Sequence, residues 1–312
     1  MKKNILTWTP VVFCLALICT SLWGSAFPSV KIGYRLFLVG AEDTASQILF
    51  AGFRFFLAGI LVILIGSISS KKLLLPSKDS LLPILWLSLF QTTIQYYFFY
   101  IGLAHASGVK SSIITASSTF FTLIIAALVF HYEKLTLKKI LGCLIGFSGV
   151  VLITTAGASL SGGLSIKGEG FVLLSTVSYA MSSCLVKGYS KKFSPVMLCG
   201  YQFILGGAML IAGGFFMGGH LTVTTPLAFL LLFYMAIISS VAYTIWGILL
   251  KHNPVSKICI FSFTNPVIGV ILSALLLGEQ NQAFSIYGLL ALILVSIGIV
   301  VVYAEKRMPT NA

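Results

Sequence analysis

The sequence predicts an all-α membrane protein with ten transmembrane helices in two inverted five-helix repeats. Of its 312 residues, 58% are hydrophobic and only 9% are charged, whereas a soluble domain carries about 25% charged residues. The mean hydropathy is +1.05. Apolar runs recur along the whole chain, and the second half repeats the pattern of the first. This composition excludes a soluble globular enzyme, because too little polar surface is present to cover one.

Ten apolar runs are predicted to be membrane spans, because a helix needs about 20 mostly apolar residues to cross a bilayer. In chain order they cover residues 11–30, 48–68, 81–103, 109–130, 140–156, 170–186, 195–217, 227–250, 255–277 and 284–303. Pro195 and Pro226 lie where runs begin, and a missing backbone N–H costs least there. The first run is interpreted as a retained span, since Trp23 and Pro28 do not suit a signal-peptide cleavage site.

The basic residues predict the orientation of the chain. If every run crosses the membrane and both termini are cytoplasmic, 15 of the 20 lysines and arginines lie on the cytoplasmic side. That asymmetry is what the positive-inside rule requires. We therefore expect a multi-pass protein of the cell membrane (inner or plasma membrane). Its net charge of +13 indicates contact with anionic lipid, and no nucleic-acid partner is expected.

The two halves of the sequence form an internal repeat. A shift of 148 residues aligns Gly52 with Gly200 and Gly59 with Gly207. A shift of 146 residues aligns Tyr97 with Tyr243, Tyr100 with Trp246, Thr119 with Asn265 and Glu133 with Glu279. The predicted repeats cover residues 11–156 and 170–304, with a linker at 157–169. Five spans per repeat is an odd number, so the copies have opposite orientations, an arrangement typical of secondary transporters.

Several short motifs accompany this repeat. They are Trp23-Gly24-Ser25 and Lys31 in the first span, Arg54 in the second, the segment 97–102 in the third, and Pro266 and Leu-Leu-Gly-Glu (276–279) in the ninth. With these motifs the chain resembles the EamA-type ten-helix transporters of the drug/metabolite transporter superfamily, over about residues 11–304. The resemblance implies a transporter that exports small metabolites, with amino acids or related amphipathic compounds as the first expectation, by alternating access.

Other functions stay open at this point. Within the same superfamily, the alternative is a drug carrier or a nucleotide-sugar-like carrier. Outside transport, the alternatives are a membrane-embedded enzyme or a sensory subunit. No aspartate or glutamate lies inside a predicted span, and metal-binding or phosphate-binding motifs are absent from the sequence. We therefore expect no catalytic residue, no cofactor and no metal.

Arg54 is the one ionisable residue well inside a predicted span. A buried arginine must face an aqueous cavity or meet protein acceptors, so it either binds a substrate anion or fixes a neighbouring helix. Aromatic and small polar residues on the other spans either line a cavity or mediate helix packing. The predicted substrate-binding residues are Trp23, Arg54, Gln95, Tyr97, Tyr100, Thr119, Tyr179, Gln202, Tyr243, Trp246 and Asn265.

Three further expectations concern movement, assembly and coupling. Pro28 and Pro266 are predicted hinges, since each removes a helical hydrogen bond. The glycine-rich fifth and tenth spans are assigned to packing or to a homodimer, and the other expected partners are a small-molecule substrate and the lipid bilayer. No group in the spans is expected to titrate near neutral pH; Lys31 would be an exception only if burial lowered its pKa, and it is interpreted as a solvated lysine at the lipid headgroups. We therefore expect facilitated movement of substrate, with proton antiport as the second choice.

Overall fold

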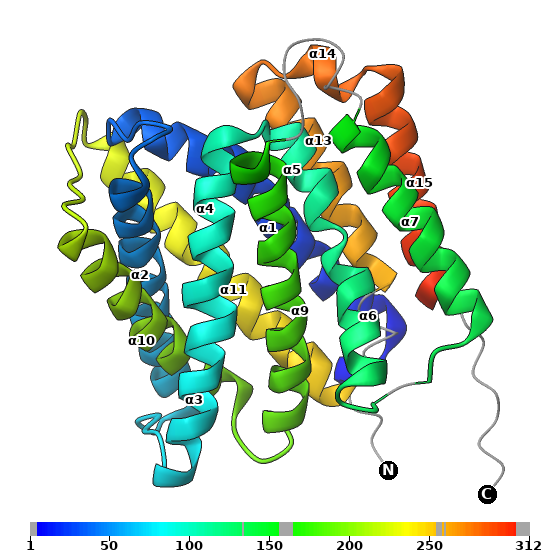
Figure 1. Cartoon of the computed structure of the whole chain (residues 1–312). Helices are drawn as coiled ribbons and strands as arrows, with labels where there is room; N and C mark the ends of the chain where they lie inside the picture. The colour runs from blue at the N-terminus through cyan, green and yellow to red at the C-terminus, as the bar shows by residue number, and fades with distance from the viewer. Residues whose placement is uncertain (1–4, 133, 156–164, 254–257, 259, 304–312) are drawn as a thin grey trace, which may run out of the picture.

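A computed structural model describes residues 5–132, 134–155, 165–253, 258 and 260–303 (Figure 1). The described residues form helices and contain no strand, which confirms the all-α class. In chain order the elements are η1 (Ile5–Thr7), α1 (Thr9–Leu36), α2 (Thr44–Ser70), η2 (Lys78–Ser80), α3 (Leu81–Leu87), η3 (Ser88–Ile94), α4 (Gln95–His105), α5 (Gly108–Thr115), α6 (Ser118–Leu128), α7 (Leu137–Thr155), η4 (Ile166–Gly170), α9 (Phe171–Tyr189), α10 (Pro195–Phe216), α11 (Leu227–His252), η5 (Ile260–Phe263), α13 (Thr264–Leu277), α14 (Gln280–Ala283) and α15 (Ile286–Tyr303).

Within the described residues, seven helical segments are long and apolar enough to cross a membrane: Thr9–Leu36, Thr44–Ser70, Gly108–Leu128, Leu137–Thr155, Ile166–Tyr189, Pro195–Phe216 and Leu227–His252. Phe261–Leu277 and Ile286–Val302 are shorter apolar helices. The consecutive elements α3, η3 and α4 occupy the third predicted run. The chain is thus a multi-pass membrane protein, and the count of ten spans stays a prediction.

Successive segments run alternately toward two opposite ends of the bundle, which we call the α14 end and the α3 end (Figure 1). Side-chain caps begin several of the helices. Asp43 accepts the backbone N–H of Ser46 at the start of α2, at 3.0 Å. Ser107 accepts the N–H of Lys110 at the start of α5, at 3.1 Å. Such caps satisfy N–H groups that have no partner within the helix.

Three of the predicted runs are not plain α-helices. The fourth is interrupted at residues 116–117, between α5 and α6, without a proline. The third contains the π-helical turn η3, and in the ninth the 3-10 turn η5 directly precedes α13. Pro28 lies inside α1, whereas Pro266 lies in the first turn of α13. The N–H groups of a first turn have no acceptor within the helix, so the missing N–H of Pro266 costs little. Their role as hinges stays a prediction.

The helices α2 and α10 pack closely through glycines that the sequence repeat had aligned. A Cβ on Gly59 would lie 2.7 Å from the carbonyl oxygen of Gly200, and one on Gly207 would lie 3.0 Å from that of Gly52. The repeat matches Gly52 with Gly200 and Gly59 with Gly207, so the two contacts are related by exchange of the halves. The repeat boundaries themselves stay a prediction.

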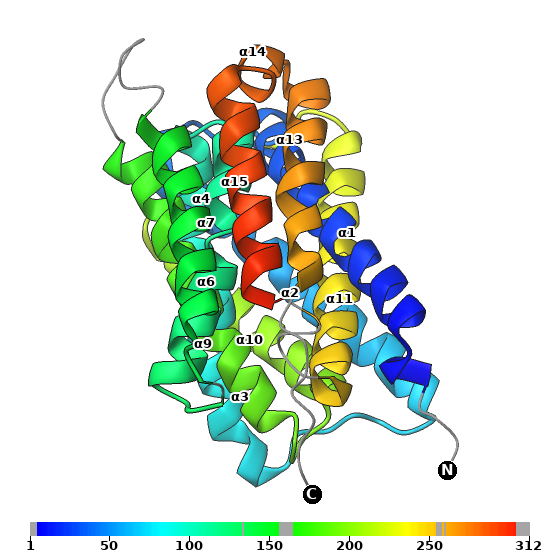
Figure 2. The same ribbon diagram turned by 90° about the vertical axis from the view of Figure 1, so that its right-hand side faces the viewer.

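The glycine-rich helices α7 and α15 also pack against each other within the chain (Figure 2). A Cβ on Gly142 would lie 2.9 Å from the carbonyl oxygen of Gly298, and one on Gly298 would lie 2.6 Å from the backbone nitrogen of Gly146. These glycine faces are therefore occupied inside one molecule. The predicted homodimer would have to use other faces of the two helices, where Leu144 and Ile297 are exposed.

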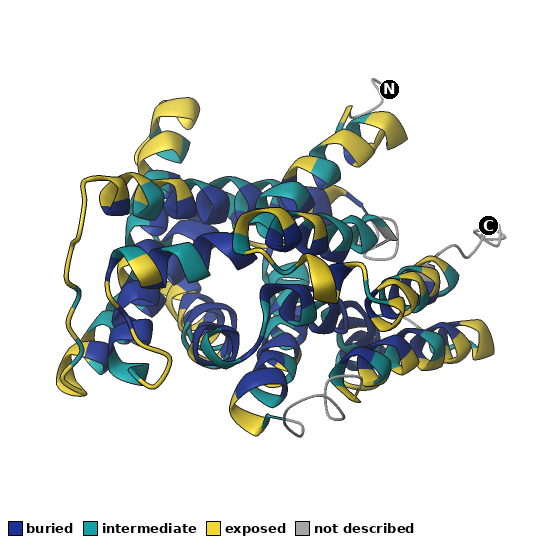
Figure 3. Cartoon of the chain, turned by 90° about the horizontal axis from the view of Figure 1, so that it is seen from above, coloured by how far each residue is buried: buried dark blue, intermediate teal, exposed yellow. Residues whose placement is uncertain are grey.

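Burial and charge are arranged as a membrane protein requires. Seen along the bundle, buried residues face the interior and exposed ones lie on the periphery (Figure 3). Most of the acidic residues that the structure describes lie at the α14 end, among them Glu42, which accepts a hydrogen bond from His105 at 3.2 Å. That bond and the charges of His105 and Lys167 hold the pKa of Glu42 below its usual value. The lysines at 71, 72, 78, 187, 191 and 192 lie at the α3 end (Figure 1).

Candidate functional site

A cavity of ≈ 90 Å³ lies between the two halves of the bundle. A single water needs about 10–15 Å³ of such volume, so the cavity has room for a small organic molecule. Its lining begins at Thr115 and Ser175, about two helical turns below the starts of α5 and η4 at the α14 end. At the other end the lining includes Tyr132 and Leu250, close to the α3 end. The cavity therefore extends toward the α3 end.

Arg54, from the middle of α2, places a guanidinium on this cavity. The residue is 2% exposed. Its Nε donates to the carbonyl oxygen of Met235 at 3.1 Å, and one terminal nitrogen donates to the Tyr100 hydroxyl at 2.8 Å. The guanidinium also lies over the ring of Phe55, 4.8 Å from its centre. A guanidinium has five N–H donors, so three of them have no acceptor among the described residues.

Aromatic rings form one wall of the cavity. Trp23 of α1 makes edge-to-face contacts with Tyr179, Tyr243 and Trp246, at centroid distances of 6.2, 5.2 and 5.0 Å. Tyr243 is hydrogen bonded to the hydroxyl of Tyr96 and accepts from Gln95 Nε2 at 3.3 Å. Edge-to-face packing of this kind fixes the rings relative to one another. The wall therefore offers a rigid apolar surface to a flat or apolar part of a ligand.

Hydroxyl groups from α5, α6 and α9 form a second part of the lining, which we call the hydroxyl wall. Thr115, Thr122, Ser175, Thr176 and Ser183 each donate to a backbone carbonyl three or four residues earlier in the same helix. A carbonyl cannot donate, so the hydroxyl hydrogen is used in each of these bonds. What remains for a ligand at these groups is acceptor capacity, part of which Thr176 already uses to accept from the Ser117 hydroxyl at 3.1 Å. This wall therefore suits ammonium, amine or hydroxyl donors.

Eight of the predicted residues line the cavity: Trp23, Arg54, Gln95, Thr119, Tyr179, Tyr243, Trp246 and Asn265. Tyr100 does not line it and acts instead as a partner of Arg54. Gln202 is fully buried away from the cavity, where its side-chain oxygen accepts from Thr92 at 2.5 Å.

Tyr97 is the third predicted residue that does not line the cavity; it is 36% exposed, and its neighbour Tyr96 takes the cavity position. Successive side chains of an α-helix project about 100° apart, so only one of these two neighbouring tyrosines faces the cavity. The predicted alignment of Tyr97 with Tyr243 was off by one residue on α4.

The sequence reasoning missed the contribution of α9. Besides Tyr179, the lining includes Ser175, Thr176 and Ser183 from this helix. Positions 175, 179 and 183 are four residues apart, so they share one helical face. That spacing was visible in the sequence and would have identified the stripe. Phe99 and Tyr132 also line the cavity, and neither carries a periodic signal that sets it apart.

The chain resembles known transporters over nearly its whole length. The EamA-like transporter family matches residues 11–155 and 166–304. The chain is 26% identical over 300 residues to the "Uncharacterized transporter YvbV" of Bacillus subtilis (strain 168), covering 94% of this chain and 92% of that protein. It is 27% identical over 307 residues to an "Uncharacterized transporter" of Archaeoglobus fulgidus, covering 96% and 99%.

Two further similarities bear on the site and the fold. A Salmonella typhimurium protein named "Probable amino-acid metabolite efflux pump" is 26% identical over 291 residues, covering 88% of this chain and 89% of that protein. A crystal structure of another protein shares the fold, with a TM-score of 0.68 at 17% identity, covering 96% of this chain and 99% of that one. Since the family match spans nearly the whole chain, this protein belongs to the EamA-like transporter family.

Proposed function

We propose that this transporter exports small amphipathic metabolites, amino acids first among them, by alternating access. The observation that carries the proposal is the Arg54 guanidinium, which faces a cavity with three N–H donors unused by the described residues. Such a group binds a carboxylate in a bidentate way. The hydroxyl wall supplies acceptors for an ammonium group, and the aromatic wall contacts an apolar side chain. The name of the Salmonella relative supports the same class of substrate.

The direction and the membrane are part of the proposal. The lysine-rich α3 end is the cytoplasmic one by the positive-inside rule, and the cavity extends toward that end. In this conformation a metabolite from the cytoplasm would enter. We propose the cell membrane as the location, with the termini cytoplasmic. The lining residues that the structure describes include no aspartate, glutamate, histidine or lysine. This supports facilitated movement of substrate without proton coupling.

Transport in proteoliposomes is the test of this function. We expect efflux of one or more labelled amino acids down their gradient, and the same rate with and without an imposed pH gradient. Protein-free liposomes and a protein with Arg54→Gln are the controls. Accumulation of substrate driven by the pH gradient alone would replace the uniport mechanism by proton antiport. Transport of drugs or nucleotide sugars in place of amino acids would contradict the proposed substrate and support the alternative substrate class.

The orientation gives a separate prediction. Lys191 lies at the α3 end, and His220 lies in the exposed connection at the α14 end. In a background without native cysteines, we expect Lys191→Cys to resist a membrane-impermeant thiol reagent applied to intact cells. His220→Cys should react with it. Labelling of both positions after permeabilisation is the control for accessibility, and the opposite pattern in intact cells would invert the proposed topology.

A further inference from the structure

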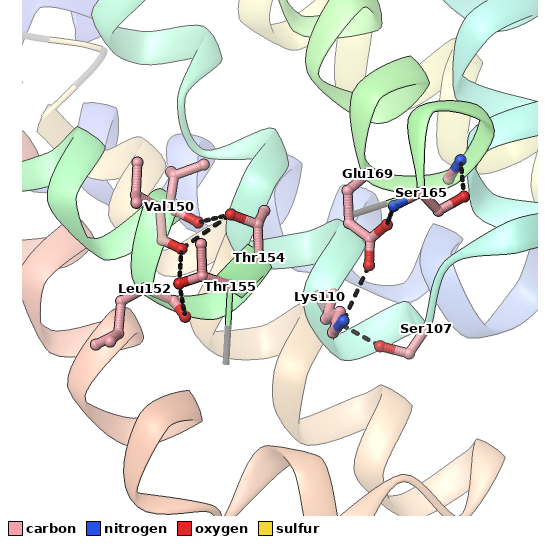
Figure 4. Close-up of polar contacts among 10 residues, drawn as sticks. Ser107, Lys110, Val150, Leu152, Thr154, Thr155, Ser165 and Glu169 are labelled. Carbon is pink, nitrogen blue, oxygen red and sulfur yellow. Dashed lines mark hydrogen bonds and ion pairs between the residues drawn. The ribbon is translucent and has the colours of Figure 1, made fainter. Parts of the chain in front are cut away.

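Two carboxylates hold the start of α5 at the α14 end of the bundle. Glu279 accepts the backbone N–H of Gly108 through Oε1 at 3.0 Å and that of Val109 through Oε2 at 2.8 Å. Glu169 pairs with Lys110 Nζ at 2.9 Å (Figure 4). We call these five residues, Glu279, Gly108, Val109, Lys110 and Glu169, the α5 clasp.

The α5 clasp consists of hydrogen bonds to a carboxylate and an ion pair that is mostly buried, and both are strong contacts. The first N–H groups of a helix have no partner within it and lie at the positive end of the helix dipole. Glu279 gives two of them an ionised acceptor, and charge-assisted hydrogen bonds are about twice as strong as neutral ones. The side chains of Lys110 and Glu169 are 19% and 8% exposed, so salt screens this pair less than a surface pair. Glu169 also accepts the N–H of Ser165 at 3.2 Å.

Local sequence explains why the clasp joins α5 to α13. Helix α13 ends at Leu277, and Gly278 then adopts a φ of +74°, a left-handed conformation that favours glycine. This reversal brings Glu279 beside the start of α5. Gly108 permits the close approach, because a Cβ there would lie 2.6 Å from Ser273 Oγ. The clasp thus joins two segments that line the cavity farther down, through Thr115 and Asn265.

The contact between α5 and α13 near the clasp contains a hydroxyl group without a partner. Ser273 of α13 is buried beside Gly108, and its side chain has no hydrogen-bond partner among the described residues. Buried polar groups in native proteins are nearly always paired, and leaving one unpaired is unfavourable. Water that entered between α5 and α13 would supply the missing partner. The unpaired hydroxyl therefore favours separation of α5 from α13.

We propose that the α5 clasp is the gate of the cavity at the α14 end, and that Glu279 is the positioning residue that keeps α5 against α13. While the clasp is formed, the cavity extends only toward the α3 end. When it opens, α5 separates from α13 and the cavity reaches the α14 end. The inference rests on alternating access in the proposed function, and it is independent of the substrate.

Cysteine accessibility tests the gate without a substrate. Ser112 is fully buried on α5, one turn after Gly108, and packs against Gly269 of α13. Ser183 lines the cavity on α9. In a cysteine-free background, we expect Glu279→Gln to raise the rate at which Ser112→Cys reacts from the α14 side about tenfold, because it removes a charge-assisted bond. The same variant should lower the reaction of Ser183→Cys from the α3 side.

The opposite changes at the two ends distinguish a gate from a loosened fold. A merely structural role for Glu279 would raise the reactivity of both cysteines together, and that result would overturn the proposal. Unchanged reactivity of Ser112→Cys would also overturn it. Lys110→Met, which breaks the pair with Glu169, is a second variant with the same expected pattern.

The control is Asp79→Asn, which removes an exposed pair with Lys192, 3.3 Å long, at the α3 end. This variant should leave the reaction rates of Ser112→Cys and Ser183→Cys unchanged. Failure of amino-acid transport in proteoliposomes would leave these measurements, and the gate, intact.

Discussion

Replacement of Arg54 by glutamine is expected to lower transport about 100-fold while the protein still inserts into the membrane. Removing one partner of a buried charged contact costs about 2–5 kcal/mol, and 2.7 kcal/mol corresponds to a factor of about 100. Glutamine keeps a polar side chain of moderate length but loses the positive charge and the planar fork that binds a carboxylate. The measurement is initial efflux rate against substrate concentration in proteoliposomes, with insertion checked by size-exclusion chromatography.

Two matched variants separate substrate binding from support of the fold. Arg54 also donates to Met235 and Tyr100, so part of its effect acts through helix packing. Tyr100→Phe removes the hydroxyl partner alone, and we expect it to change KM by no more than about threefold. Gln202→Ala, at the position that the repeat matches to Arg54, should leave KM unchanged, because Gln202 does not line the cavity. Normal transport by Arg54→Gln would make Arg54 a purely structural residue.

Sequence reasoning identified Arg54 because a charge inside an apolar run is costly wherever it lies. It could not identify the partners. Met235 contributes a backbone carbonyl, a group that every residue has, and lies 181 positions away along the chain. The same holds for Glu279: its motif was recognised, but its acceptors are backbone N–H groups of α5. A backbone group can be a partner whatever side chain its residue carries, so the sequence gives no sign of such a contact.

The second feature that the sequence did not predict was local helix geometry, which decides the direction in which each side chain points. The aromatic residues Trp23, Tyr243 and Trp246 of the predicted spans lie on the cavity, and the helices that carry them, α1 and α11, are regular α-helices. The alignment of the repeats misplaced Tyr97 by one residue, because nothing in the sequence shows which of the two neighbouring tyrosines, Tyr96 or Tyr97, faces the cavity. The break between α5 and α6 was hidden for a similar reason, since no proline or glycine lies at residues 116–117. Hydrophobic patterns thus predicted the elements and missed local departures from helical geometry.

The contact between α2 and α10 predicts a large effect on stability. On α10, a Cβ at Gly207 would lie 3.0 Å from the carbonyl oxygen of Gly52 and closer still to the backbone nitrogen of Phe56. Backbone atoms cannot move aside as a side chain can, so a larger residue must push the two helices apart. We expect Gly207→Val to cost about 3 kcal/mol or more. The protein should then unfold at a Tm lower by about 6–12 °C or fail to accumulate.

Gly213 on the same helix is the matched control, because a Cβ there would meet no atom within 4 Å. Gly213→Val adds the same side chain to α10, so it reproduces any effect on helix propensity or lipid contact. We expect its Tm in detergent to stay within about 2 °C of the parent protein, since valine has a higher helix propensity than glycine. Equal losses in the two variants would mean that an effect of valine common to both sites, and not the contact with α2, lowers the stability at Gly207. A normal Tm for Gly207→Val would show that α2 and α10 can separate freely, and the glycine contacts between the halves would then carry no stability.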